Sequence, residues 1–508
     1  MSKQLDLRDI QGNVVRAYGR YSFPFARYVF LNVHDARRGR DFVGAVAEQV
    51  TTAARWDEGP HPSGKPLSTV NIGFAYQGLK ELEVPRASLI GFPMEFVMGM
   101  KKRKDILGDD GPSAPQHWDP IWRDNRETDR HKDVHIWVSI NGQSQLDVQR
   151  RYEWLQQLVH QSAGGVIVLS GHRGDNGEHL PFQDVHAVFE NGKATSKEHF
   201  GYTDGIGDPV FEGLPARPER VTGRGKQMKD GKWAPLATGE FLLGHRDEAD
   251  EYPLAPSPQL LSRNGTFMVY RKLHQNVGSF NALLDRAGAG FPGGRELLAA
   301  KFVGRWRDNG APLAAAPDAR SKAAWDEKFA QASPAERDRM LSGFTYDEDM
   351  QGAKCPFSAH IRRINPRASL EFTPGAFNTP GALANRRRII RRGLPYGEVK
   401  DPARDDGDHG IVIMMLNASI QRQFEFVQQQ WINYGNDFKA SNDKEIILGN
   451  HCPIRRGKAV IEADPDGDDP PFFLTDIPRL VETRGGDYFF IPSMTALRMI
   501  AQGIVDPT

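Results

Sequence analysis

The stretch that decides the fold is Ala26-Arg27-Tyr28-Val29-Phe30-Leu31-Asn32-Val33, near the start of the chain. β-Branched and aromatic residues dominate it, so we predict a strand. Residues 41–52 place apolar side chains on one stripe, which predicts an amphipathic helix. The alternating run at residues 69–74 predicts a second strand. Strand, helix and strand in this order are typical of a split βαβ, ferredoxin-like unit.

The same order continues along the chain. In the first half we predict helices at residues 76–83, 93–107 and 150–161 and a strand at residues 133–140. In the second half we predict strands at residues 265–272, 411–417 and 486–492 and helices at residues 277–286 and 420–431. The fold class is therefore α+β, with two ferredoxin-like domains whose antiparallel sheets are surrounded by helices. We place these domains at residues 1–220 and 221–508, with a helical insertion near residues 314–340 that is rich in Ala, Lys, Asp and Glu.

Composition excludes several classes of protein. The 508 residues contain 65 Lys plus Arg and 65 Asp plus Glu, so no net charge attracts nucleic acid or an anionic membrane. The two cysteines, Cys355 and Cys452, are too few for a disulfide framework and lack the spacing of a metal finger. The N-terminal residues show no secretory signal, and no apolar run reaches the roughly 20 residues of a membrane span. We expect a soluble, cytoplasmic protein with no nucleic-acid or membrane partner.

One histidine stands among arginines in Cys355-Pro356-Phe357-Ser358-Ala359-His360-Ile361-Arg362-Arg363, and Asn365, Pro366 and Arg367 follow. A neutral imidazole is a good ligand for iron, and guanidinium groups suit the carboxylates of a haem. The alternative is a solvated basic surface, in which His360 binds nothing. By itself the run is more often of the second kind.

Two other segments bear on this choice. Asp204 lies between glycines in Gly201-Tyr202-Thr203-Asp204-Gly205-Ile206-Gly207, which allows backbone to approach a flat ligand closely. Its alternative is an ordinary Asp-Gly turn. Arg391 and Arg392 follow an apolar pair and precede Gly393, which could direct one guanidinium into a pocket; the alternative is a basic surface run.

Taken together these segments resemble the dye-decolorizing peroxidases over nearly the whole chain. The resemblance begins at residues 9–13, continues through 108–115 and the Gly-x-x-Asp-Gly motif at 201–205, and reaches the His-Ile-Arg and Arg-Arg-Gly segments at 360–362 and 391–393. It ends near residues 485–490. The length and the helical insertion resemble the larger, non-secreted bacterial branch. The resemblance implies two ferredoxin-like domains of the dimeric α+β barrel type, with one haem b per chain held mainly by the second.

The resemblance also implies a role for each matching residue. His360 matches the proximal ligand of the haem iron, Asp204 the distal acid and Arg391 the distal arginine. Glu425 is a candidate to accept a hydrogen bond from the proximal imidazole. Further haem contacts are implied for Gly205, Ile206, Gly207, Asn365, Pro366, Arg367, Ile411 and Ile413, with Arg367 at a propionate and the two isoleucines over the distal face.

The function implied is reduction of hydrogen peroxide through a ferryl intermediate, with oxidation of dyes, phenols or another aromatic or small reductant, by a monomer or homo-oligomer. An ionised Asp204 can move the peroxide proton, and Arg391 can stabilise the charge that develops as the O–O bond breaks. A carboxyl with a reference pKa of about 3.9 predicts activity that persists to acid pH.

Bulky dyes cannot enter a small pocket, so Tyr396 and Trp431 are candidates to relay electrons from the surface, although a core position for either is an equal alternative. Three other functions compete with the peroxidase. The first is a haem-handling protein with little turnover, which needs only His360. The second is a chlorite-dismutase-like or haem-decarboxylating enzyme, which lacks the Asp204 motif. The third is a basic α+β module without haem.

Overall fold

The computed structural model describes residues 4–19, 22–56, 64–123, 129–174, 176–215, 218–371, 381–452, 454, 457–463 and 470–504. Among these residues, nine strands form one antiparallel sheet in the order β13-β14-β12-β17-β2-β3-β1-β4, and β7 also pairs with β1. The strands are β1 (Phe25–Val33), β2 (Ser68–Phe74), β3 (Ile136–Gly142), β4 (Val166–Val168), β7 (Gln183–His186), β12 (Thr266–Gln275), β13 (Ile390–Tyr396), β14 (Gly410–Asn417) and β17 (Val481–Ile491).

The sheet consists of two groups of strands that come from the two halves of the chain. They meet where β17 pairs with β2, at Phe490 and Phe74. The buried amide of Gln11 holds this junction: it donates to the carbonyls of Ile72 (2.9 Å) and Pro492 (3.0 Å) and accepts from the Ile72 N–H (3.0 Å). The predicted α+β class with antiparallel sheets and surrounding helices is confirmed, whereas the domain boundary near residue 220 stays a prediction.

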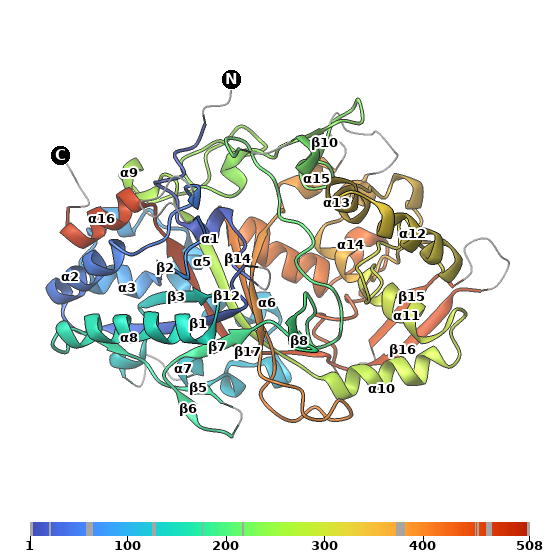
Figure 1. Ribbon diagram of the computed structural model, residues 1–508, viewed down its shortest axis with the longest axis horizontal. Coiled ribbons are helices and arrows are strands. Elements are labelled where there is room, and N and C mark those ends of the chain that lie inside the picture. The colour runs from blue at the N-terminus through green and yellow to red at the C-terminus, as the bar shows by residue number, and fades with distance from the viewer. Residues whose placement is uncertain are drawn as a thin grey trace.

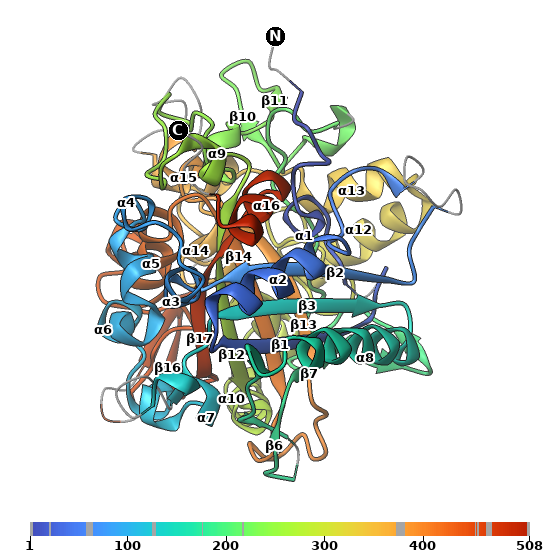
Figure 2. The ribbon, with the colours of Figure 1, turned by 90° about the vertical axis from the view of Figure 1, so that its left-hand side faces the viewer.

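Helices lie at the two ends of the molecule (Figure 1). Helix α8 (Gln145–Gln161) packs on β1 and β3, as Figure 2 shows. At the other end of the molecule in Figure 1 lie α12 (Ala319–Gln331) and α13 (Pro334–Ser342), which confirm the helices predicted near residues 314–340. Each begins at a capping box, with Asp318 and Ser333 as the N-caps.

Two predicted helices differ from the observed ones because of local backbone chemistry. The helix predicted at 41–52 is α2 (Ala36–Ala47), which begins early because the Asp35 carboxylate accepts the N–H of Arg38. The helix predicted at 93–107 is broken at Gly99, whose φ of 75° lies in the left-handed region. The pieces are α5 (Met94–Met98), η2 (Met100–Arg103) and α6 (Lys104–Leu107).

The elements around the cavity in the second half of the chain differ most from expectation. Strand β13, which carries Arg391, was not predicted. The helix expected at 420–431 consists of two π-helical segments, η10 (Gln421–Glu425) and η11 (Val427–Ile432). Such wide turns are frequent at functional sites.

Candidate functional site

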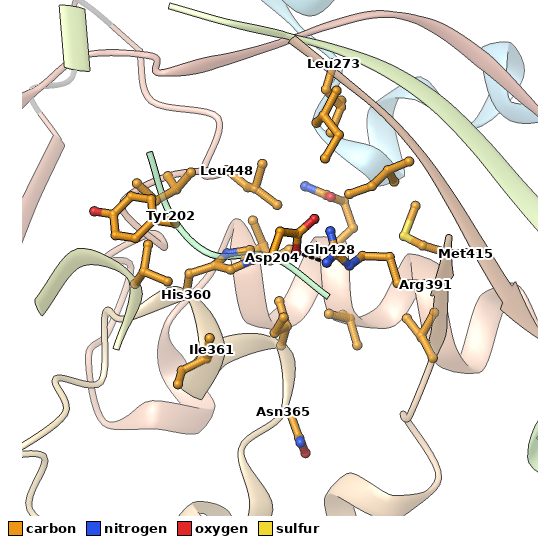
Figure 3. Close-up of a pocket in the computed structure, with 18 of the residues that line it drawn as sticks. Tyr202, Asp204, Leu273, His360, Ile361, Asn365, Arg391, Met415, Gln428 and Leu448 are labelled. Atoms are coloured by element: carbon orange, nitrogen blue, oxygen red, sulfur yellow. Dashed lines mark hydrogen bonds and ion pairs between the residues drawn. The ribbon is translucent and has the colours of Figure 1, made fainter. Parts of the chain in front are cut away.

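A cavity of about 400 Å³ lies between strands β13 and β14 on one side and segment η11 with helix α14 (His360–Ile364) on the other. This volume falls in the usual range for a small-molecule or cofactor site. Figure 3 shows side chains from these separate elements around one space. The predicted residues His360, Asp204 and Arg391 all line the cavity, although more than 150 positions separate the first two.

His360 is the first residue of α14, and its side chain is 23% exposed. Its Nδ1 atom lies 3.5 Å from Oε1 of Glu445, a fully buried carboxylate. That oxygen also accepts the N–H of Ile447 at 2.8 Å, and the other oxygen accepts the N–H of Leu448. Burial raises the pKa of Glu445, but the imidazole and these backbone N–H groups outweigh it, so the pKa is lowered overall. Glu445 is therefore an anion that faces the back of the imidazole.

The expectation that Glu425 partners His360 is wrong. The Glu425 carboxylate is buried but accepts from Arg103 Nε (2.8 Å) and from the Tyr488 hydroxyl (2.9 Å). Sequence reasoning missed Glu445, and its one signal was an acid placed directly before the apolar run Ile446-Ile447-Leu448.

Arg362 and Arg363 are not surface charges, because both are fully buried. Arg362 bonds to Asp349 (2.7 Å), and Arg363 donates to backbone carbonyls that include those of Trp431 and Tyr434 (both 2.7 Å). These two side chains fix the short helix that carries His360. The basic-surface interpretation of this run is therefore wrong.

Across the cavity, Arg391 of β13 forms an ion pair with Asp204, drawn as a dashed line in Figure 3. The same Asp204 oxygen accepts the N–H of Gly205 at 2.7 Å. Strand alternation separates the two neighbouring arginines. Arg392 points away from the cavity and donates to the Asn13 carbonyl (2.6 Å) and to Asp208 (2.8 Å).

Three half-buried arginines, Arg305, Arg367 and Arg388, line a further wall of the cavity. Their hydrogen bonds in the described part of the chain go to backbone carbonyls and to no carboxylate. Burial is the main cause that lowers their pKa values, to about 10 for Arg305 and Arg367 and about 9 for Arg388. Sequence reasoning identified only Arg367.

The charge of this cluster indicates whether the cavity suits a haem, which carries two carboxylates. Buried charge without a counterion is costly, so a ligand that brings carboxylates stabilises these three side chains. The opposite imidazole supplies an iron ligand, and apolar side chains line much of the space between: Ile361, Ile364, Ile411, Ile413, Phe424, Val427 and Leu448. The residues present therefore fit a haem.

The other predicted contacts are distributed unevenly. Gly205, Ile206, Gly207, Asn365, Ile411 and Ile413 line the cavity, and the buried Oδ1 of Asn365 has no hydrogen-bond partner among the described residues. Pro366 is not among the lining residues.

Tyr396 and Trp431 are core residues, each 1% exposed, so neither can contact a dye at the surface. The Trp431 indole N–H donates to the exposed Asp437 carboxylate at 3.0 Å. The Tyr396 hydroxyl is buried with no hydrogen-bond partner in the part of the chain described, and the Lys272 ammonium lies 4.6 Å from its ring centroid.

Two further findings concern metal ions and membranes. The described residues contain no group of three His, Cys, Asp or Glu side chains that could hold a metal ion. Their helices are all too short or too polar to span a bilayer.

The chain is similar to known dye-decolorizing peroxidases. Residues 9–173 match a family model described as the DyP dimeric alpha+beta barrel domain. The dye-decolorizing peroxidase msp1 of Mycetinis scorodonius is 24% identical over 98% of this chain and 88% of its own. The multifunctional dye peroxidase DyP2 of Amycolatopsis sp. is 33% identical over 61% of this chain and 62% of its own.

Solved structures agree as well. An ancestral D-type dye-decolorizing peroxidase superposes with a TM-score of 0.71 at 26% identity and covers 97% of this chain and 99% of its own. The DyP-type peroxidase of Auricularia auricula-judae, at 22% identity, shares the fold with a TM-score of 0.73, over 98% of this chain and 100% of its own.

Proposed function

Because the chain belongs to the dye-decolorizing peroxidase family, we propose that it is a haem b peroxidase that reduces hydrogen peroxide and oxidises dyes, phenols or related small donors. The observation that carries the proposal is the pairing of two half-sites across one cavity. The Glu445–His360 pair lies on one wall, and the Asp204–Arg391 pair lies on another. A protein that only stores haem needs the first pair but has no use for the second.

Residues of this chain would hold one haem b. His360 would ligate the iron through the nitrogen that does not face Glu445, while Arg305, Arg367 and Arg388 would bind the propionates. When bound, the haem supplies an iron centre that accepts oxygen from peroxide and passes the oxidising equivalents to a donor. The Glu445 carboxylate raises the basicity of the imidazole, since an anionic partner at the second ring nitrogen makes it a stronger ligand.

Asp204 and Arg391 would act on the peroxide itself. The Asp204 carboxylate would take the proton from the oxygen that attacks the iron and return it to the oxygen that leaves as water. The Arg391 guanidinium stays charged at every working pH and would stabilise the negative charge that develops during O–O cleavage. Their ion pair keeps both groups at the same end of the cavity before peroxide arrives.

Donors too large to enter the cavity of about 400 Å³ would require an electron path. Of the two candidates, Trp431 is favoured, since the Asp437 carboxylate can accept its proton when the ring is oxidised. Tyr396 has no such acceptor, and the Lys272 cation beside its ring opposes loss of an electron. Trp431→Phe should therefore lower the rate of oxidation of a large anthraquinone dye more than the rate of oxidation of a small phenol. Tyr396→Phe should change neither rate.

The deciding experiment is stopped-flow mixing of haem-loaded protein with hydrogen peroxide, followed at the Soret band. Wild type should respond rapidly, and Asp204→Ala and Arg391→Leu should each be slower by roughly 100-fold or more. The exposed Asp250→Ala is the matched control and should behave as wild type. A wild-type Soret band that does not respond to peroxide would favour haem handling, and a chain that takes up no haem would favour the module without haem.

A further inference from the structure

Met415 occupies a position in the cavity that the proposed chemistry does not use. On β14 the alternate residues Ile411, Ile413 and Met415 face the cavity, while Val412, Met414 and Leu416 are buried on the opposite face. Cross-strand pairing sets Met415 directly opposite Arg391 of β13. Side chains at such paired positions have Cβ atoms about 5 Å apart, and Figure 3 shows the two side chains next to each other.

We propose that Met415 is an oxidative modification site, at which hydrogen peroxide delivered to the Asp204–Arg391 pair converts the thioether to the sulfoxide. The inference rests on the proposed peroxidase function, because that function brings peroxide to this wall of the cavity. Oxidation of Met415 then sets how long the enzyme stays active in hydrogen peroxide.

The reaction is balanced with the groups already present. A sulfur lone pair attacks one peroxide oxygen, an S–O bond forms and the O–O bond breaks. Asp204 moves the proton from the transferred oxygen to the departing one, which leaves as water. Sulfur loses two electrons and peroxide gains two, so no other oxidant or reductant is needed.

The product would change the site in a specific way. A sulfoxide is polar, and its oxygen is a hydrogen-bond acceptor where the wall was apolar. The Arg391 guanidinium, on the residue paired with Met415 across the strands, is a strong donor, so the sulfoxide competes with Asp204 for that side chain. Once Arg391 turns toward Met415, it no longer stabilises O–O cleavage and activity falls.

Other methionines serve as internal controls. Met94 is 66% exposed on the surface, and it measures oxidation by peroxide in bulk solution. Met414, next in sequence to Met415, is buried on the other side of β14 and should resist oxidation. Selective oxidation of the Met415 thioether would therefore result from its place in the cavity and not from peroxide in bulk solution.

The first test is peptide mass spectrometry of haem-loaded protein after exposure to hydrogen peroxide without a reducing donor. Met415 should gain one oxygen before Met94 does, and Met414 should remain a thioether. Asp204→Ala protein under the same peroxide should lose this preference, because the proton carrier of the step is gone. Equal oxidation of Met94 and Met415 in the loaded protein, or an intact Met415 in inactivated protein, overturns the inference.

The second test compares survival in peroxide, with each protein normalised to its own initial rate. Met415→Leu should have a half-life several-fold longer than that of wild type, and Met94→Leu should match wild type. Methionine sulfoxide reductases should restore activity to inactivated wild type, because they reverse only this modification. An unchanged Met415→Leu half-life counts against the inference.

The two proposals can fail separately. If the loaded protein turns over peroxide but Met415 is spared, only the modification site is lost and the peroxidase remains. If the loaded protein shows neither a Soret response nor turnover, the proposed function fails and the inference fails with it.

Discussion

The surroundings of His360 show how much one neighbour matters at the scale of a residue. An imidazole among three arginines would be a poor iron ligand if it were protonated or free to rotate. The buried Arg362 donates to the Asp349 carboxylate and the buried Arg363 donates to backbone carbonyls, so neither guanidinium interacts with the imidazole ring. Glu445 lies at the ring and is held there by two backbone N–H groups.

Glu445→Gln should therefore raise the reduction potential of the haem iron and slow its reaction with peroxide by roughly 10–100-fold. The substitution keeps the size of the side chain and removes its charge. A spectroelectrochemical titration of the loaded protein measures the potential. Glu425→Gln is the matched control, since that buried carboxylate pairs with Arg103 instead, and it should leave the potential as it is. Equal potentials in wild type and Glu445→Gln would refute the role of Glu445.

The cluster of three half-buried arginines leads to a separate prediction. Arg388→Gln removes one of three positive charges that have no carboxylate partner in the described structure, so haem should bind more weakly. Haem raises the melting temperature through its affinity for the folded state, and this rise should shrink in the variant. Thermal melts with and without haem measure it, and Arg404→Gln, at an exposed arginine, should show the full rise. If haem raises the melting temperature of Arg388→Gln as much as that of wild type, Arg388 does not bind a propionate.

At the scale of an element, strand β13 determines which arginine acts. Its alternation sends Arg391 into the cavity and Arg392 toward Asn13 and Asp208. Gly393 follows with a φ of +123°, and a Cβ there would collide with the Val412 carbonyl on β14. The Arg-Arg-Gly sequence is thus a strand that needs glycine to pair closely with its neighbour.

Gly393→Ala should cost about 1–3 kcal/mol of unfolding free energy and shift Arg391 from Asp204, because backbone strain and collision act together. Urea unfolding gives the free energy, and the Soret response to peroxide reports the position of Arg391. Gly231→Ala is a sharp control: its φ of +80° is also left-handed, but nothing lies within 4 Å of an added Cβ. If both variants lose the same unfolding free energy and activity, the collision with the Val412 carbonyl is not the cause of the loss.

At the scale of the whole molecule, stability depends on pH through buried histidines. His199, His274 and His409 pack together at one end of the sheet, with ring centroids 5.6 Å and 5.0 Å apart. Burial is the main cause that lowers the pKa values of His199 and His274 to about 4. In the unfolded chain these rings titrate near their ordinary value of about 6.5.

The stability that depends on these neutral rings is complete above about pH 6.5 and is lost as pH falls toward about 4, by up to roughly 3 kcal/mol for each ring. The melting temperature should therefore fall over this range, and His274→Gln should flatten the fall. The exposed His179→Gln should not. Acid inactivation of the enzyme would then accompany unfolding. A melting temperature that stays constant down to about pH 4 would contradict this expectation.

Most of what the sequence determined by itself is local. The strand at residues 26–33 and the helices near residues 314–340 follow from local residue composition, and the α+β order follows largely from side-chain periodicity. The resemblance also named His360, Asp204 and Arg391, and these three do line one cavity. Segments broke or shifted where a single group overruled the pattern, as Gly99 and Asp35 did.

Tertiary structure alone decided the partners. Whether Glu425 or Glu445 faces the imidazole depends on how η10 and the segment after η11 pack against α14, and both acids are equally buried. Arg305, Arg367 and Arg388 come from three separate segments of the chain, so no sequence spacing predicts that they form one cluster. Periodicity specifies which face of an element is apolar, but only long-range packing specifies which charged side chains share a space, and the chemistry of this protein depends on that packing.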